Sequence, residues 1–116
     1  MDERIEKAFE VANYMATLSN QRRLMLEEFN QNIVFYLNGG TFKITPELIS
    51  LVKTWVDLGK VKDQVFIDEN NFPILVDDVE SFYTSLVEKY SSATIEYHNK
   101  FTELKIKRKI SAIVEL

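Results

Sequence analysis

The residue types that carry most enzyme chemistry are scarce in this sequence. His98 is the single histidine and cysteine is absent, so the chain offers no thiolate nucleophile and no pair of nitrogen or sulfur ligands at metal-binding spacing. Serine and acidic residues are present, but no Gly-x-Ser-x-Gly turn marks a nucleophile. We therefore expect no enzymatic activity, no cofactor and no metal site.

Two further clusters have the composition of ligand sites without the required spacing. Five carboxylates gather in one part of the chain: Asp68, Glu69, Asp77, Asp78 and Glu80. They lack the glycine and the terminal glutamate of a calcium-binding loop, and acidic residues at 77–80 also suit the first turn of a helix. The glycine pair in 38–41 is not followed by the Lys-Ser/Thr and helix of a phosphate-binding loop, so we expect a hairpin turn there.

Basic residues are concentrated near the C-terminus. Residues 1–98 contain 9 basic against 16 acidic side chains, whereas 99–116 contain 5 against 2. Four of the basic residues lie close together: Lys105, Lys107, Arg108 and Lys109. Such a cluster can contact phosphate or an acidic partner, so a nucleic-acid-binding accessory protein is the alternative function. The dipole at a helix C-terminus also favours cations, and this simpler explanation stays open.

The first element expected along the chain is a long helix within residues 1–32. Apolar residues at helical spacing predict an amphipathic helix over 5–18, and the pattern resumes from Leu24 to Phe29. We expect one continuous helix. Two helices meeting at the polar segment 19–23 are the alternative.

A β-hairpin is expected next. Residues 33–37 are β-branched and aromatic, 41–45 alternate between polar and apolar, and Gly39 and Gly40 between them accept the positive φ of a tight turn. The alternative extends the first helix to Asn38, with Gly39 just beyond its end. After the hairpin, a threonine, a proline and an acid at 45–47 predict the start of a helix that ends at Gly59.

A second hairpin and a second helix follow the same order. Strands at 65–67 and 73–76 flank a polar turn, and Asp77 is expected to cap a long C-terminal helix. Sliding the chain by 31 residues lays 34–56 over 65–87 and matches Ile44 with Leu75. This predicts a ββα pseudo-repeat within 33–90, whose hairpins could pair into one small antiparallel sheet. Any two ββα segments share such a pattern, so an unrelated pair is equally consistent.

The C-terminal helix is long for a chain of this size. Residues 77–109 would span about 50 Å as a helix, whereas a compact chain of this length has a radius of gyration of about 13 Å. Apolar residues recur along it in heptads, and we expect them to form the interface of a homodimer or higher oligomer. The interface residues expected are Tyr90, Tyr97, Phe101 and Leu104. A kink at Ser91 and Ser92 that folds the helix back is the alternative.

Composition indicates one folded domain. The chain has 116 residues, of which 46% are hydrophobic and 28% charged, with a net charge of −4. We expect a single α+β domain over 1–116, with a helical arm (1–32), the ββα pair (33–90) and a helical extension ending in a basic and apolar tail (91–116). The longest apolar run, 33–37, is too short to span a membrane, and the charged N-terminus resembles no secretory signal.

Two stretches resemble a known group of proteins. NGGTFKITPELISLV (38–52) and KYSSATIEYHNKFTELKIKRKI (89–110) resemble small uncharacterised proteins of marine contractile-tailed phages. The likeness covers about 33–116 and includes a Gly-Gly-Thr-Phe hairpin, an Asp-x-Asn-x-Pro turn near 68–73 and a tyrosine-rich helix ending in a basic run. This sequence departs from the turn pattern by carrying both Asn71 and Phe72.

The resemblance implies a phage origin and no catalytic activity. Together with the residues above, it leads us to expect a non-enzymatic, self-associating phage protein with a role in virion assembly or protein–protein interaction. We expect a location in the host cytoplasm or in the virion, no membrane, and a second phage protein as partner. Nucleic acid is the less favoured partner.

Overall fold

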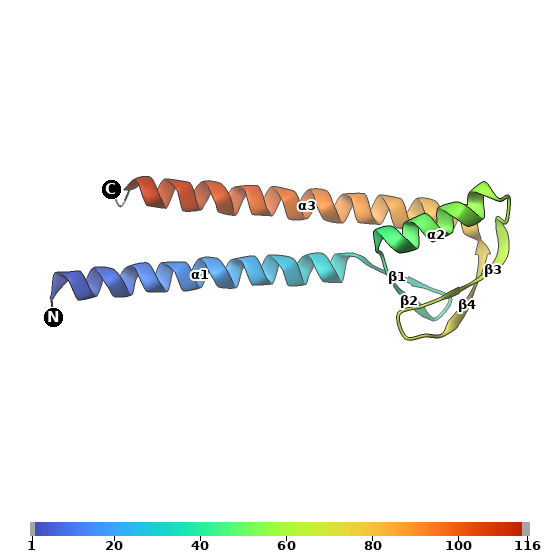
Figure 1. Ribbon diagram of the computed structural model, residues 1–116, viewed down its shortest axis with the longest axis horizontal. Coiled ribbons are helices and arrows are strands. Elements are labelled where there is room, and N and C mark those ends of the chain that lie inside the picture. Colours follow the sequence, from blue (N-terminus) through green and yellow to red (C-terminus); the bar gives the residue numbers. More distant parts are fainter. Residues whose placement is uncertain (1, 115–116) are drawn as a thin grey trace. The chain divides into compact units, whose positions relative to one another are not determined.

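The computed structural model describes residues 2–114, with side chains for 2–107, and the chain divides into two compact units. The helix-pair unit comprises Met1–Phe29 and Glu96–Leu116, and the hairpin unit comprises Asn30–Ile95. Figure 1 labels the elements in chain order: α1 (Glu3–Asn32), β1 (Val34–Leu37), β2 (Gly40–Lys43), α2 (Pro46–Asp57), β3 (Lys62–Ile67), β4 (Pro73–Asp78) and α3 (Val79–Val114). The expected α+β class, with two long terminal helices, two hairpins and a short middle helix, is confirmed.

Both long helices are continuous at the segments where the sequence pattern allowed an interruption. α1 runs through the polar segment 19–23, as expected, and α3 runs through Ser91 and Ser92 without interruption. The alternative in which the first helix extends to Asn38 is wrong, because β1 begins at Val34. α1 and α3 each contribute residues to both units.

The first hairpin has the tight turn that an Asn-Gly pair favours. Asn38 and Gly39 both have positive φ, 50° and 80°, which matches the twist of antiparallel strands joined by two residues. The expectation of a positive φ at Gly40 is wrong. A Cβ on Gly40 would lie 2.5 Å from Cγ1 of Ile74, so this glycine is required because the second hairpin packs against it.

Local signals at both ends of α2 work as expected. The hydroxyl of Thr45 accepts a hydrogen bond from the Leu48 N–H, which satisfies one of the free donors at the helix start. At the other end Gly59 has a φ of 76°, and the Lys60 N–H donates to the Trp55 carbonyl in a glycine-terminated cap.

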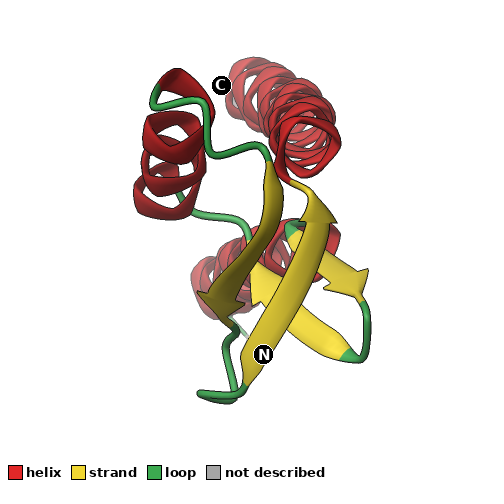
Figure 2. Ribbon diagram, turned by 90° about the vertical axis from the view of Figure 1, so that its right-hand side faces the viewer, coloured by secondary structure: helices red, strands yellow, loops and turns green. Residues whose placement is uncertain are grey.

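The two hairpins form two separate two-stranded sheets, which corrects the expectation of one sheet. In Figure 2 the hairpins cross at an angle. Residues at the tip of the second hairpin form hydrogen bonds with the backbone of β2. The Glu69 N–H donates to the Thr41 carbonyl, and the Thr41 N–H donates to the Asp68 carboxylate. Thr41 is therefore bound to a turn and cannot pair with a further strand there.

The pseudo-repeat alignment is out of phase in its second strand. Ile44 is fully buried, but its match Leu75 is 48% exposed, whereas the next residue, Val76, is 1% exposed. The turn from β3 to β4 is longer than the turn from β1 to β2, so a constant shift of 31 residues fails beyond it. A one-residue slip moves every strand side chain to the opposite face.

The start of α3 differs from the expectation by one residue. Asp77 lies within β4, and the helix is capped by Asp78, whose carboxylate accepts the Ser81 N–H at 3.0 Å. A strand thus leads directly into a long helix, with the capping side chain at the junction.

Aromatic rings form the centre of the hairpin unit. The ring of Phe82 on α3 lies 5.1–5.8 Å from the rings of Phe35, Phe42 and Phe66, which belong to three different strands. The largest fully buried side chains all come from this unit: Phe42, Ile44, Leu86, Val52, Val76 and Val79.

Asp68 connects the hairpins through its buried carboxylate. One oxygen accepts the Thr41 N–H at 2.9 Å, and the other accepts the N–H groups of Asn70 and Phe72 at 3.0 and 2.8 Å. The Thr41 hydrogen bond is the main cause that holds the pKa of Asp68 below its ordinary value, against burial, which raises it. The carboxylate shapes its own turn and fixes it to β2.

Replacing Gly40 by alanine should destabilise the protein by about 1–3 kcal/mol, because the new methyl group would collide with Ile74. In an Ile74→Ala background the same change should cost far less, since the colliding atoms are gone. Urea unfolding of the four proteins, followed by circular dichroism, measures both costs. Equal costs in the two backgrounds would show that Ile74 is not the obstacle.

Asp68→Asn should lower the free energy of unfolding at neutral pH, because the ionised acceptor of three N–H groups is lost. The folded-state pKa of Asp68 lies below the ordinary value of 3.8, so its contribution is present above that pH and is lost as the pH falls through the folded-state pKa.

The stability difference between wild type and Asp68→Asn should therefore shrink as the pH falls from about 5 to about 2. Urea midpoints across this range measure it. Asp77→Asn, at an exposed carboxylate of the same hairpin, is the matched control. A pH-independent difference would contradict the assignment.

Candidate interaction site

Within the helix-pair unit, α1 and α3 run side by side in opposite directions (Figure 1). Leu18 on α1 and Leu104 on α3 are buried. The rings of Phe29 and Tyr97 lie 5.0 Å apart across the two helices, and Phe101 stacks on Tyr97 along α3. Apolar contacts between facing helical stripes thus define the pair.

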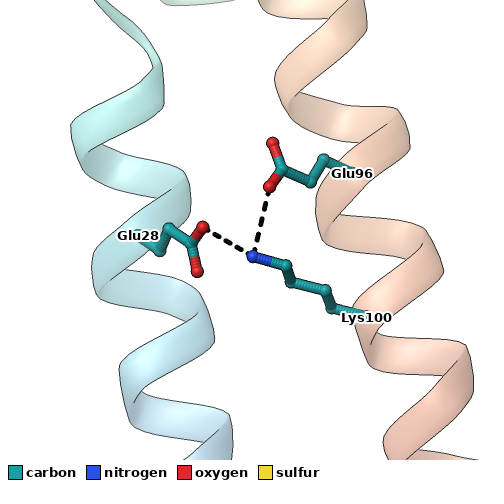
Figure 3. Close-up of polar contacts among 3 residues, drawn as sticks. All are labelled: Glu28, Glu96 and Lys100. Carbon is teal, nitrogen blue, oxygen red and sulfur yellow. Dashed lines mark hydrogen bonds and ion pairs between the residues drawn. The ribbon is translucent and has the colours of Figure 1, made fainter.

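One edge of the helix pair is closed by charged groups. The Lys100 ammonium donates to Glu28 on α1 and lies 3.1 Å from Glu96 on its own helix (Figure 3). The hydrogen bond to Glu28, followed by that to Glu96, raises the pKa of Lys100 above its ordinary value. The lysine therefore carries its charge at neutral pH and joins the two helices.

The other edge of the helix pair is open. Two adjoining hollows share Arg22 and Phe101, and together they form what we call the open groove. Its lining residues are Leu18, Ser19, Arg22, Arg23, Leu26, Tyr97, Phe101, Leu104 and Lys105. Lys105 follows Lys100 by five residues, which is about 140° around a helix, so the groove and the closed edge lie on different sides of α3.

The described charges along the open groove are all positive. Its charged lining residues are Arg22, Arg23 and Lys105. Arg23 pairs with Glu27 at 3.2 Å, while Arg22 and Lys105 form no ion pair with any residue whose side chain the structure describes. The groove therefore combines an apolar floor with two cations that have no counterion among the described side chains.

A second apolar surface lies on the opposite side of α1. Ile5 and Phe9 are 47% and 57% exposed, and alanines at 12 and 16 continue their spacing along the helix. Phe9 and Leu18 are nine residues apart, which is about two and a half helical turns. Their side chains therefore point to opposite sides of α1. α1 thus carries one apolar side toward α3 and another toward solvent, which we call the outer face of α1.

The residues expected at an oligomer interface are partly used within the chain. Leu104 is buried, and Tyr97 and Phe101 are half-buried, with Tyr97 against Phe29 and Phe101 lining the open groove. Tyr90 is half-buried and belongs to the hairpin unit. The heptad pattern along α3 therefore serves at least in part to pack the chain's own helices.

The basic cluster is described only in part. Lys105 and Lys107 are exposed, and Lys105 lines the open groove. The side chains of Arg108 and Lys109, and those of the apolar tail at 110–116, lie outside the described residues. Sequence reasoning missed Arg22 as a neighbour of Lys105, because α1 has apolar residues on two sides and their spacing does not show which side faces α3.

The described residues of the other candidate sites do not come together in the structure. His98 is exposed, and no three histidine or acidic residues in the described part of the chain are placed to hold a metal ion. The acidic cluster is divided, because Asp68 binds backbone N–H groups and Asp78 caps α3. None of the described helices combines the length and apolar character needed to cross a bilayer.

Lys100→Glu should lower the thermal midpoint of the helix pair by a few degrees, because it places a third carboxylate between Glu28 and Glu96. Lys100→Glu combined with Glu28→Lys should recover most of the loss. Thermal scans of helical circular dichroism measure both. Lys107→Glu, at an exposed lysine of the same helix, is the control, and an equal loss there would contradict a specific role for Lys100.

In comparisons with known proteins, no family model, no curated protein and no solved structure matched this chain.

Proposed function

We propose that this chain is a non-enzymatic, self-associating protein that acts through protein–protein contacts, with virion assembly in a phage as its setting. The phage setting rests on the resemblance of 38–52 and 89–110 to small phage proteins. The self-association rests on the surface of α1.

The outer face of α1 is the single observation that carries the proposal. Ile5 and Phe9 expose about half of their area on the side of the helix turned away from α3, where the described residues of the chain leave them uncovered. Contiguous apolar surface of this kind is typical of interfaces, and a symmetric dimer covers it with the same surface of a second copy. Because Leu104 is buried within the chain, we place the interface on this face rather than on the expected α3 residues.

The alternative, a nucleic-acid-binding accessory protein, draws on the exposed Lys105 and Lys107. Affinity for nucleic acid grows with the number of cations that meet phosphates. The cluster also includes Arg108 and Lys109, but the chain as a whole has a net charge of −4, which opposes binding to a polyanion. We therefore place this function second.

Light scattering at micromolar concentration should give about twice the chain mass of 13.6 kDa. Ile5→Asp combined with Phe9→Asp should return the mass to that of one chain with unchanged helical circular dichroism, because two charges then replace the apolar centre of the interface. Leu51→Asp, at a residue 45% exposed on α2, should leave the mass unchanged. A monomeric wild type at high concentration, or a double variant of unchanged mass, would contradict the proposal.

A further inference from the structure

We propose that the open groove binds an acidic amphipathic helix of a partner protein. The apolar side of that helix would rest on Tyr97, Phe101 and Leu26, and its carboxylates would meet Arg22 and Lys105. This inference deepens the proposed function, on whose protein–protein role it rests, by naming the chemistry of the partner.

The floor of the groove selects for an apolar ligand surface. Tyr97 and Phe101 are half-buried, and the leucines at 18, 26 and 104 surround them. The groove runs between two antiparallel helices, a setting in which a third helix packs its side chains into the grooves between the ridges of the other two. A helix with apolar residues three and four positions apart fits such a floor.

The charges of the groove select for an acidic ligand. At the closed edge, the cation has its counterions within the chain, because Glu28 and Glu96 both pair with Lys100. At the open groove, Arg22 and Lys105 have no ion pair among the described side chains, and none of the described lining residues is acidic. The same two helices thus present one edge whose lysine is paired within the chain and one edge whose cations would be paired by carboxylates of the partner.

A second copy of the groove is a poor occupant. A symmetric contact of groove with groove would place Arg22 and Lys105 near the same cations of the other copy, and like charges at an interface oppose association. Nucleic acid also fits less well, because its phosphates would leave the exposed part of Leu26 and the half-buried rings of Tyr97 and Phe101 without an apolar partner.

The test uses the full-length chain and two labelled helical peptides. One peptide carries leucine and phenylalanine at helical spacing flanked by glutamate, and the other carries the same apolar residues flanked by lysine. Fluorescence anisotropy should show binding of the glutamate peptide, weakening with added salt, and little binding of the lysine peptide.

Two pairs of charge reversals locate the binding. Arg22→Glu with Lys105→Glu should weaken binding of the glutamate peptide at least about tenfold. Lys43→Glu with Lys53→Glu, at exposed lysines of the hairpin unit, should leave it unchanged. Circular dichroism of both variants checks that they are folded.

The proposal fails if the glutamate peptide does not bind, if the lysine peptide binds equally well, or if the groove variant binds like wild type. It also fails if a short DNA duplex binds more tightly than the peptide and loses its affinity in the groove variant, since the groove then serves phosphates. Repeating the titration with the Ile5→Asp, Phe9→Asp variant separates the two proposals. Peptide binding by that variant supports the groove whatever the oligomeric mass proves to be.

Discussion

The hairpin unit depends on the packing of one ring, that of Phe82. It comes from the first turns of α3 and contacts a phenylalanine from β1, from β2 and from β3. A two-stranded sheet is only marginally stable alone, because it has too little apolar surface to bury. Here each hairpin packs at least one phenylalanine against the same helix. The close approach of Ile74 to Gly40 and the hydrogen bonds of Asp68 then fix how the hairpins meet.

The elements could be predicted because their signals are local. The Asn-Gly turn, the Thr45 cap and the end of α2 at Gly59 depend on residues a few positions apart, and the structure confirms them. The relation between the hairpins could not be predicted in the same way. It depends on the Asp68 carboxylate reaching Thr41, 27 residues away, and on a longer second turn that shifts the strand register. Hydrophobic alternation does not reveal either feature.

The candidate site also combines a feature that the sequence pattern predicts with features that depend on contacts between distant residues. The heptad spacing of Tyr97 and Leu104 indicated a helix that packs along another helix, but it did not distinguish α1 of the same chain from a second chain. The open groove was not predictable, because Arg22 and Lys105 are 83 positions apart in the sequence and become neighbours only when α1 and α3 pair. The outer face of α1 also required the structure, since a helix with apolar residues on two sides does not show which side is buried.

The hydrogen bond between Glu28 and Lys100 joins residues 72 positions apart, and the whole hairpin unit lies between them. Closing a flexible loop of that length costs conformational entropy, and prior folding of the intervening segment reduces this cost. During synthesis, α1 leaves the ribosome before the segment of α3 with which it pairs has been made. The order of synthesis therefore leaves α1 with both of its apolar sides exposed until that segment of α3 has been made, and a nascent chain with such a helix is a natural substrate for chaperones.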